Sequence, residues 1–104
     1  MKENATVSKM VSEIVKICSP FQVFMVSFKT NSRGELSSFK LCIVVDDCYE
    51  DIKKLEADIQ MNTDCPVPCD VIIYRVSEWN ECVEDDCTFA YRVENAGEVL
   101  YEQM

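Results

Sequence analysis

The chain has 104 residues, of which 48% are hydrophobic and only two are glycine, so it can bury one modest core. Asp and Glu outnumber Lys and Arg by 19 to 10, which gives a formal net charge of −9. This charge argues against non-specific binding to nucleic acid or to an anionic membrane. No His is present, so the commonest general base and neutral metal ligand is missing.

The first half of the chain predicts a helix followed by a pair of strands. Apolar residues recur every three or four positions over residues 6–18, which predicts an amphipathic helix that ends before Pro20. Residues 21–28 and 39–45 predict two strands joined by a polar loop. The second strand is apolar at every position from 41 to 45, which is typical of a strand covered on both faces.

The second half predicts shorter elements. Asp46 or Asp47 is expected to cap a second helix, and residues 62–68 contain enough breakers to form a loop. Ser77 is expected to cap a short helix, and Gly97 stands where a helix C-terminal glycine is expected. The remaining predicted elements are a strand, two short helices and a strand, over residues 69–74, 77–82, 88–95 and 98–101.

These elements predict a mixed α/β fold. A hairpin followed by a crossover helix and a third strand gives a mixed sheet of about four strands with helices packed on it. The expected order is α-β-β-α-β-α-α-β, in a single domain over residues 1–104.

The seven cysteines are irregularly spaced, and several lie in apolar runs, which predicts reduced core thiols in a cytoplasmic protein. The chain begins with an amphipathic pattern instead of a signal segment, and no run is long enough to cross a bilayer. Cys65, Cys69, Cys82 and Cys87 would supply four thiolates for a zinc ion, but their spacing is looser than in the usual knuckle. Zinc binding therefore stays open at this point.

Three features together resemble the minimal nucleotidyltransferases of the DNA polymerase beta superfamily. They are the strand, loop and strand, the aspartate Asp70 on the third strand, and the tail ending in Gly97-x-x-x-Tyr101-Glu102. The resemblance runs over nearly the whole chain. It implies the mixed sheet already expected from the element order.

The catalytic motif of that family is largely replaced here. The family has a Gly-Ser pair closing the first strand, an Arg-Gly loop, Asp-x-Asp on the second strand and a third carboxylate on the next strand. Without any gap, these positions fall on Val26-Ser27, Thr30-Asn31, Ser38-Phe39-Lys40 and Asp70.

Each replacement has a chemical consequence. Val26 places a β-branched side chain where backbone amides would approach a triphosphate, so the cofactor-binding pair Val26 and Ser27 is incomplete. Lys40 brings an ammonium to a place where Mg²⁺ needs oxygen ligands. The resemblance thus implies a vestigial site at Ser27, Ser38, Lys40 and Asp70, with Asp70 as the one weak metal candidate. Lys40 either pairs with Asp70 or reaches solvent at the sheet edge.

The resemblance implies a pseudoenzyme: a nucleotidyltransferase-fold protein that has lost catalysis and acts as a binding or regulatory module. It further implies a separate helical partner of the HEPN type, as in toxin–antitoxin pairs, and self-association is equally open. The alternative is an active metal-dependent enzyme that uses Mg²⁺ and ATP and transfers a nucleotide to a protein or small molecule. A third possibility is a structural subunit without a ligand.

Two further groups of residues have both functional and structural interpretations. The pairs Asp46-Asp47 and Asp85-Asp86 are interpreted as helix caps instead of metal ligands. Four aromatic residues are expected to cover a small core, with a partly exposed interface as the alternative. These four are Tyr74, Trp79, Phe89 and Tyr91.

Overall fold

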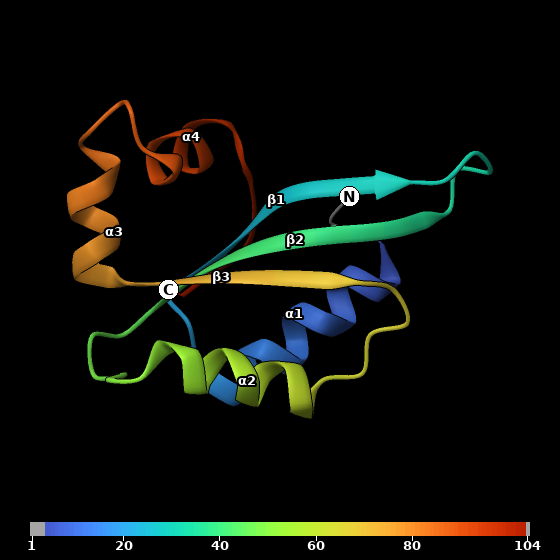
Figure 1. Ribbon diagram of the computed structural model, residues 1–104, viewed down its shortest axis with the longest axis horizontal. Helices are drawn as coiled ribbons and strands as arrows, with labels where there is room; N and C mark the ends of the chain where they lie inside the picture. Colours follow the sequence, from blue (N-terminus) through green and yellow to red (C-terminus); the bar gives the residue numbers. More distant parts are fainter. Residues whose placement is uncertain (1–3, 104) are drawn as a thin grey trace.

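The computed structural model describes residues 4–103, which form four helices and one four-stranded sheet (Figure 1). The described elements are α1 (Ala5–Cys18), β1 (Gln22–Thr30), β2 (Leu36–Val45), α2 (Ile52–Asn62), β3 (Cys69–Arg75), α3 (Val76–Val83), α4 (Phe89–Ala96) and β4 (Glu98–Glu102). This order confirms the predicted one. None of the described helices is both long and apolar enough to span a membrane.

The sheet has the strand order β3-β2-β1-β4 and is mixed, as predicted. β1 pairs antiparallel with β2 and with β4, whereas β2 and β3 are parallel. The parallel pair follows from the crossover through α2, since parallel neighbours need a long connection.

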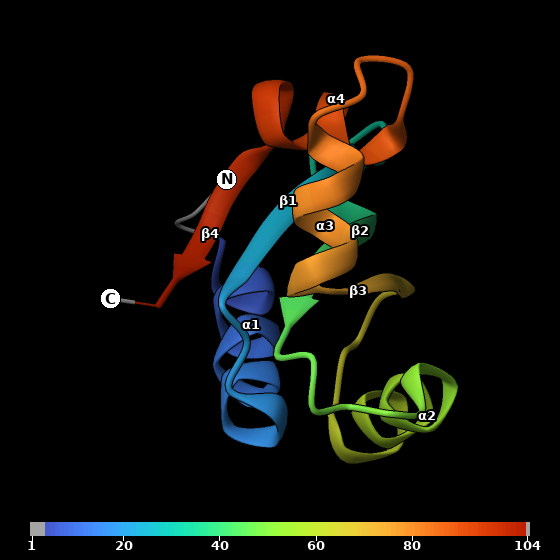
Figure 2. The same ribbon diagram turned by 90° about the vertical axis from the view of Figure 1, so that its left-hand side faces the viewer.

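Helices cover both faces of the sheet. In Figure 2, α1 and α2 lie below the sheet and α3 and α4 lie above it. We refer to the apolar layers on these two sides as the lower core and the upper core. The two layers explain why every residue from 41 to 45 in β2 is buried.

The lower core is the larger one, because α1 lays its apolar stripe along the sheet. Val7, Met10, Val11, Ile14 and Cys18 recur at helical spacing and all are buried. Burying one such large side chain contributes about 1.5–3 kcal/mol. From the sheet and α2, the lower core receives Val23, Met25, Phe39, Leu41, Ile43, Val45, Leu55, Ile59 and Val71.

The upper core covers only part of its face. Phe24, Cys42 and Val44 point upward from β1 and β2, because side chains alternate along a strand. Trp79 from α3 and Val93 from α4 pack onto them, together with Ala90. Burial raises the pKa of the Cys42 thiol to about 12, so this cysteine behaves as an apolar core residue.

The ends of α1 follow from local sequence. The side chain of Asn4 accepts hydrogen bonds from the amides of Thr6 and Val7, at 3.0 and 3.2 Å, and so caps the first turn. Ser19 has φ 43°, a left-handed conformation that stops the helix directly before Pro20.

Two of the predicted caps are wrong. Asp51, not Asp46 or Asp47, caps α2 by accepting from the Lys54 amide at 3.0 Å. Ser77 lies inside α3 and does not cap it. Asp47 caps the first turn of this helix instead, by accepting from the Ser77 amide at 3.0 Å. This hydrogen bond from the Ser77 backbone amide is the main cause that holds the pKa of Asp47 below the usual aspartate value. The contact of Asp47 with α3 was missed because a cap from a residue distant in sequence leaves no local pattern, whereas Asp51 directly precedes α2 and the prediction favoured the earlier aspartates in its place.

Arg75, at the junction of β3 and α3, was not predicted as a structural residue. Its guanidinium donates to the backbone oxygens of Tyr49 and Glu50, both at 2.6 Å, and lies 3.3 Å from the Glu78 carboxylate. These bonds fasten the loop before α2 to the start of α3. The only sequence signal was a cation between a strand and a helix.

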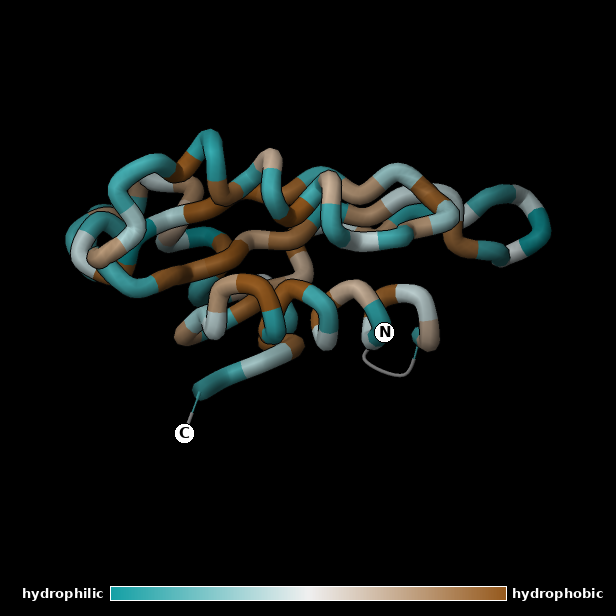
Figure 3. Tube along the Cα trace, turned by 90° about the horizontal axis from the view of Figure 1, so that it is seen from below, coloured by the Kyte–Doolittle hydropathy of each residue, from teal (hydrophilic) through white to brown (hydrophobic). Residues whose placement is uncertain are grey.

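The hairpin between β1 and β2 extends beyond the helices and ends in a hydrophilic tip (Figures 1 and 3). Asn31 accepts from the amides of Arg33 and Glu35 through its side chain. Gly34 has φ 80°, which a glycine adopts without strain. The tip is thus a well-defined turn outside both cores.

Candidate functional site

The register of three neighbouring strands brings Ser27, Lys40 and Asp70 into one row. Lys40 on β2 lies opposite Ser27 on β1 and opposite Asp70 on β3. Its chain neighbours Phe39 and Leu41 pack into the lower core, so alternation directs Lys40 to the upper face. In Figure 1, α3 and α4 lie toward one end of the strands and the hairpin between β1 and β2 lies at the other end.

A second row continues this surface toward the hairpin tip. Ser38 on β2 lies opposite Lys29 on β1 and has the same alternation as Lys40. Lys29 and Asp70 are exposed, whereas Ser27, Ser38 and Lys40 are half-buried. We call the surface formed by these five residues the polar face. All four positions of the vestigial site implied by the resemblance are part of it.

A β-bulge at Val26 joins the polar face to the upper core. The register shifts between Met25 and Ser27, so Val26 is an extra residue in β1. Val26 packs against the upper core, and the following residue Ser27 lies in the row with Lys40. The bulge therefore directs two consecutive residues to one face, which regular alternation would not allow. A bulge of this kind has no clear signal in the sequence.

Lys40 and Asp70 are neighbours but form no ion pair within 4.0 Å. The ion pairs among residues 4–103 join Lys9 to Glu13, Arg33 to Glu35 and Arg75 to Glu78. Of the two interpretations of Lys40, the structure favours the one in which its ammonium reaches solvent. Removing Lys40 would then not take a partner away from a buried carboxylate, because Asp70 is exposed.

The donor set of the polar face does not fit Mg²⁺. Among its five residues, Asp70 supplies the one carboxylate, while Lys29 and Lys40 supply two ammonium groups. Mg²⁺ requires several oxygen ligands and is repelled by neighbouring cations. The polar face is suited to hydrogen bonding and to contact with anionic groups.

Three of the four aromatic residues, Tyr74, Trp79 and Phe89, cover the upper core as expected, and Tyr91 does not. The ring of Trp79 lies 5.3 Å from those of Phe24 and Tyr74, and Phe89 stacks on Tyr74 at 6.5 Å. Trp79 is only 3% exposed, and its indole N–H donates to Glu94 at 3.1 Å. Tyr91 stays outside this stack and is 36% exposed.

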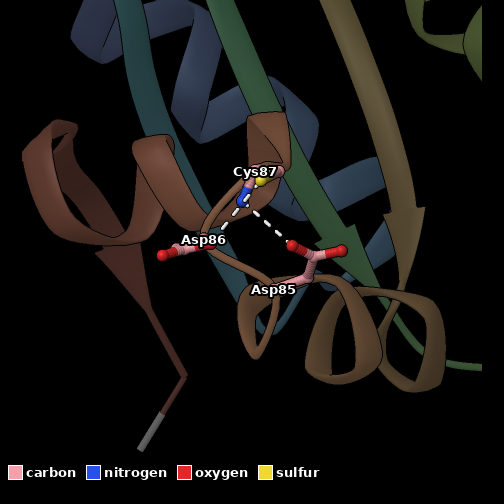
Figure 4. A group of neighbouring side chains, drawn as sticks. All are labelled: Asp85, Asp86 and Cys87. Carbon is pink, nitrogen blue, oxygen red and sulfur yellow. Dashed lines mark hydrogen bonds between the residues drawn. The ribbon is translucent and has the colours of Figure 1, made fainter.

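Neither acidic pair caps the helix that follows it, which corrects the prediction; Asp46 and Asp85 make turn contacts, and Asp47 caps α3. Asp46 accepts from the Cys48 amide at 2.8 Å, and Asp85 accepts from the Cys87 amide at 3.0 Å. In Figure 4, Asp85, Asp86 and Cys87 all come from the turn between α3 and α4, and all three are exposed. The helix that follows is capped by Thr88. These contacts account for the pairs structurally.

The four cysteines considered for zinc lie in different layers. Cys65 and Cys69 pack against the lower core, and burial raises the pKa of Cys69 to about 12. Cys82 packs against the upper core, and Cys87 is exposed in the turn before α4. The sheet separates the two pairs, so they do not form one tetrahedral set.

No protein-family model matches the chain, and no curated protein or solved structure gives a significant match. The structure itself defines a mixed α/β protein with a polar face on one half of a helix-covered sheet.

Proposed function

We propose that this chain is a non-catalytic binding module built on a nucleotidyltransferase-like sheet. The observation that supports this proposal is the row of Ser27, Lys40 and Asp70 across three strands. The positions at which the resemblance would require metal-binding carboxylates converge on one face, and a lysine occupies the centre of that row. The strand arrangement of such a site is retained, but the carboxylates that would bind the metal for phosphoryl transfer are missing.

The resemblance directs the proposal toward a protein partner, either a helical protein of the HEPN type or a second copy of the chain. We further propose a cytoplasmic location, which is supported by the two buried free thiols of Cys18 and Cys42.

A titration with Mg²⁺ and ATP tests the absence of catalysis. The amide resonances of Ser27, Ser38 and Asp70 should remain unchanged, and no product should form. Shifts at these residues together with turnover would instead support the alternative of an active metal-dependent nucleotidyltransferase.

A restoration variant provides a second test. Ser38→Asp combined with Lys40→Asp would place two carboxylates beside Asp70, and we expect Mn²⁺ to broaden nearby resonances only in this variant. Ser12→Asp combined with Lys53→Asp is the matched control, because it makes the same change in formal charge at exposed helical positions. Equal broadening near Asp70 in the parent would overturn the proposal.

A further inference from the structure

An apolar hollow of about 300 Å³ opens beside the polar face, between β1 and α4. Its lining includes Met25, Val26, Phe89, Ala96 and Gly97, and Arg92 is the one charged residue among them. The bulge at Val26 makes the hollow and the polar face continuous, since Val26 lines the hollow and the next residue belongs to the row.

The charge of this region is opposite to that of the chain. Lys29, Lys40 and Arg92 face a single carboxylate, Asp70, within the polar face and the hollow, whereas the whole chain has a net charge of −9. None of the three cations forms an ion pair with any residue from 4 to 103. Their charges are therefore available to an approaching anionic group.

We propose that the polar face and the hollow form one docking surface for an acidic segment of a partner protein, anchored by an apolar side chain. This inference rests on the proposed function as a binding module. The carboxylates of the segment would contact Lys29, Lys40 and Arg92, and its apolar side chain would enter the hollow beside Val26. Such an arrangement combines a central apolar anchor with a polar rim, as protein interfaces usually do.

The size of the hollow and the charges beside it favour this occupant over others. A volume of about 300 Å³ is at the lower limit for pockets that bury a small organic ligand, so it suits a single side chain better than a nucleotide. A second copy that docked through the same surface would bring Lys29, Lys40 and Arg92 against their own equivalents, and nucleic acid would need more clustered cations than three.

The test uses the ¹⁵N-labelled chain and three short peptides at low ionic strength. The acetylated, amidated peptide Glu-Glu-Leu-Glu-Glu contains both acidic groups and an anchor. Its analogues replace Leu by Ala or every Glu by Gln. We expect saturable amide shifts at Val26, Ser27, Lys40 and Ala96 with the first peptide, and binding about tenfold weaker with either analogue. Added salt should weaken the first peptide most.

Two variants with matched controls locate the contact. Lys40→Glu should weaken the Leu-containing acidic peptide by about tenfold, whereas Lys53→Glu, the same change on exposed α2, should not. Ala96→Leu should fill the hollow and have a similar effect, with Ala57→Leu on α2 as its control. If Ala96→Leu does not fold, the Lys40→Glu comparison still decides the result.

Several results would overturn the inference. These are equal binding of the Gln peptide, shifts that map outside the polar face and hollow, or no effect of Lys40→Glu. ATP that competes with the peptide without turnover would identify a small anion as the occupant, and self-association lost in Lys40→Glu would identify a second copy. Both results leave the binding module intact, whereas turnover of ATP would remove the proposed function itself.

Discussion

The two halves of the upper sheet face are built from the same strands and differ in what covers them. Toward one end, Phe24, Cys42 and Val44 lie beneath Trp79 and Val93 and are buried. Toward the other end, the same strands carry Ser27, Ser38 and Lys40, which are only half-buried. The comparison separates stability from binding, since the covered half supplies the packing and the open half supplies the unpaired polar groups.

The largest effect is expected from the centre of the covered half. Trp79→Ala removes a side chain that stacks on Phe24 and contacts Tyr74, and should lower the free energy of unfolding by about 3–5 kcal/mol. Urea denaturation measures the change. Tyr91→Ala, which removes an exposed ring from the same layer, is the control and should cost about 0.5–1 kcal/mol. Equal losses would show that the packing of Trp79 does not stabilise the covered half.

The next effect is expected at the boundary between the halves, where Gly97 brings α4 close to β1. A Cβ at this position would lie 2.6 Å from the Val93 carbonyl oxygen and 3.3 Å from that of Met25. Gly97 has φ −76°, so the close approach and not a left-handed conformation requires glycine. Gly97→Ala should lower the free energy of unfolding by about 1–3 kcal/mol and shift the amides that line the hollow. An unchanged urea midpoint would show that the contact is not tight.

A smaller, pH-dependent effect is expected at Asp47, which fixes the start of the covering helix α3. The hydrogen bond from the Ser77 amide lowers the pKa of Asp47 in the native state. Asp47 therefore contributes to the free energy of unfolding at pH values above its unfolded pKa, and this contribution is lost as pH falls through the native pKa. Asp47→Asn should therefore be less stable than the parent at neutral pH, and the difference should begin to shrink near the usual aspartate value of about 4 and vanish only below the lowered native pKa. Urea midpoints measured from neutral to acidic pH check this.

Asp70→Asn is the control for that series, because the Asp70 carboxylate accepts no hydrogen bond from any described residue. It should show no comparable dependence on pH. A pH-independent deficit in Asp47→Asn would mean that the charge of Asp47 does not matter for α3.

The smallest effect on stability is expected in the open half. Lys40→Met should change the free energy of unfolding by less than about 0.5 kcal/mol, because Lys40 forms no ion pair with Asp70. Thermal and urea denaturation both test this. A loss on the order of 3 kcal/mol would instead indicate a desolvated ion pair between Lys40 and Asp70 and would support the hypothesis that they pair.

Most of the helices and strands could be predicted because each depends on the pattern of a single stretch of sequence. The helical spacing from Val7 to Cys18 and the continuous apolar run in β2 each follow from one stretch of sequence. The resemblance also grouped Ser27, Lys40 and Asp70 before any register was known. The missing features depend on contacts between distant segments: the cap from Asp47 to α3, the contacts of Arg75 and the hollow beside Val26.

The position of β4 at the edge of the sheet has a consequence for how the chain folds. β4 pairs with β1 through Gln22 and Glu102, so about three quarters of the chain forms the loop that this contact closes. Contacts of such high sequence separation are slow to form, and we expect β4 to be among the last segments to join the sheet. Until then β1 would present an unpaired strand edge, the kind of surface at which incompletely folded chains associate.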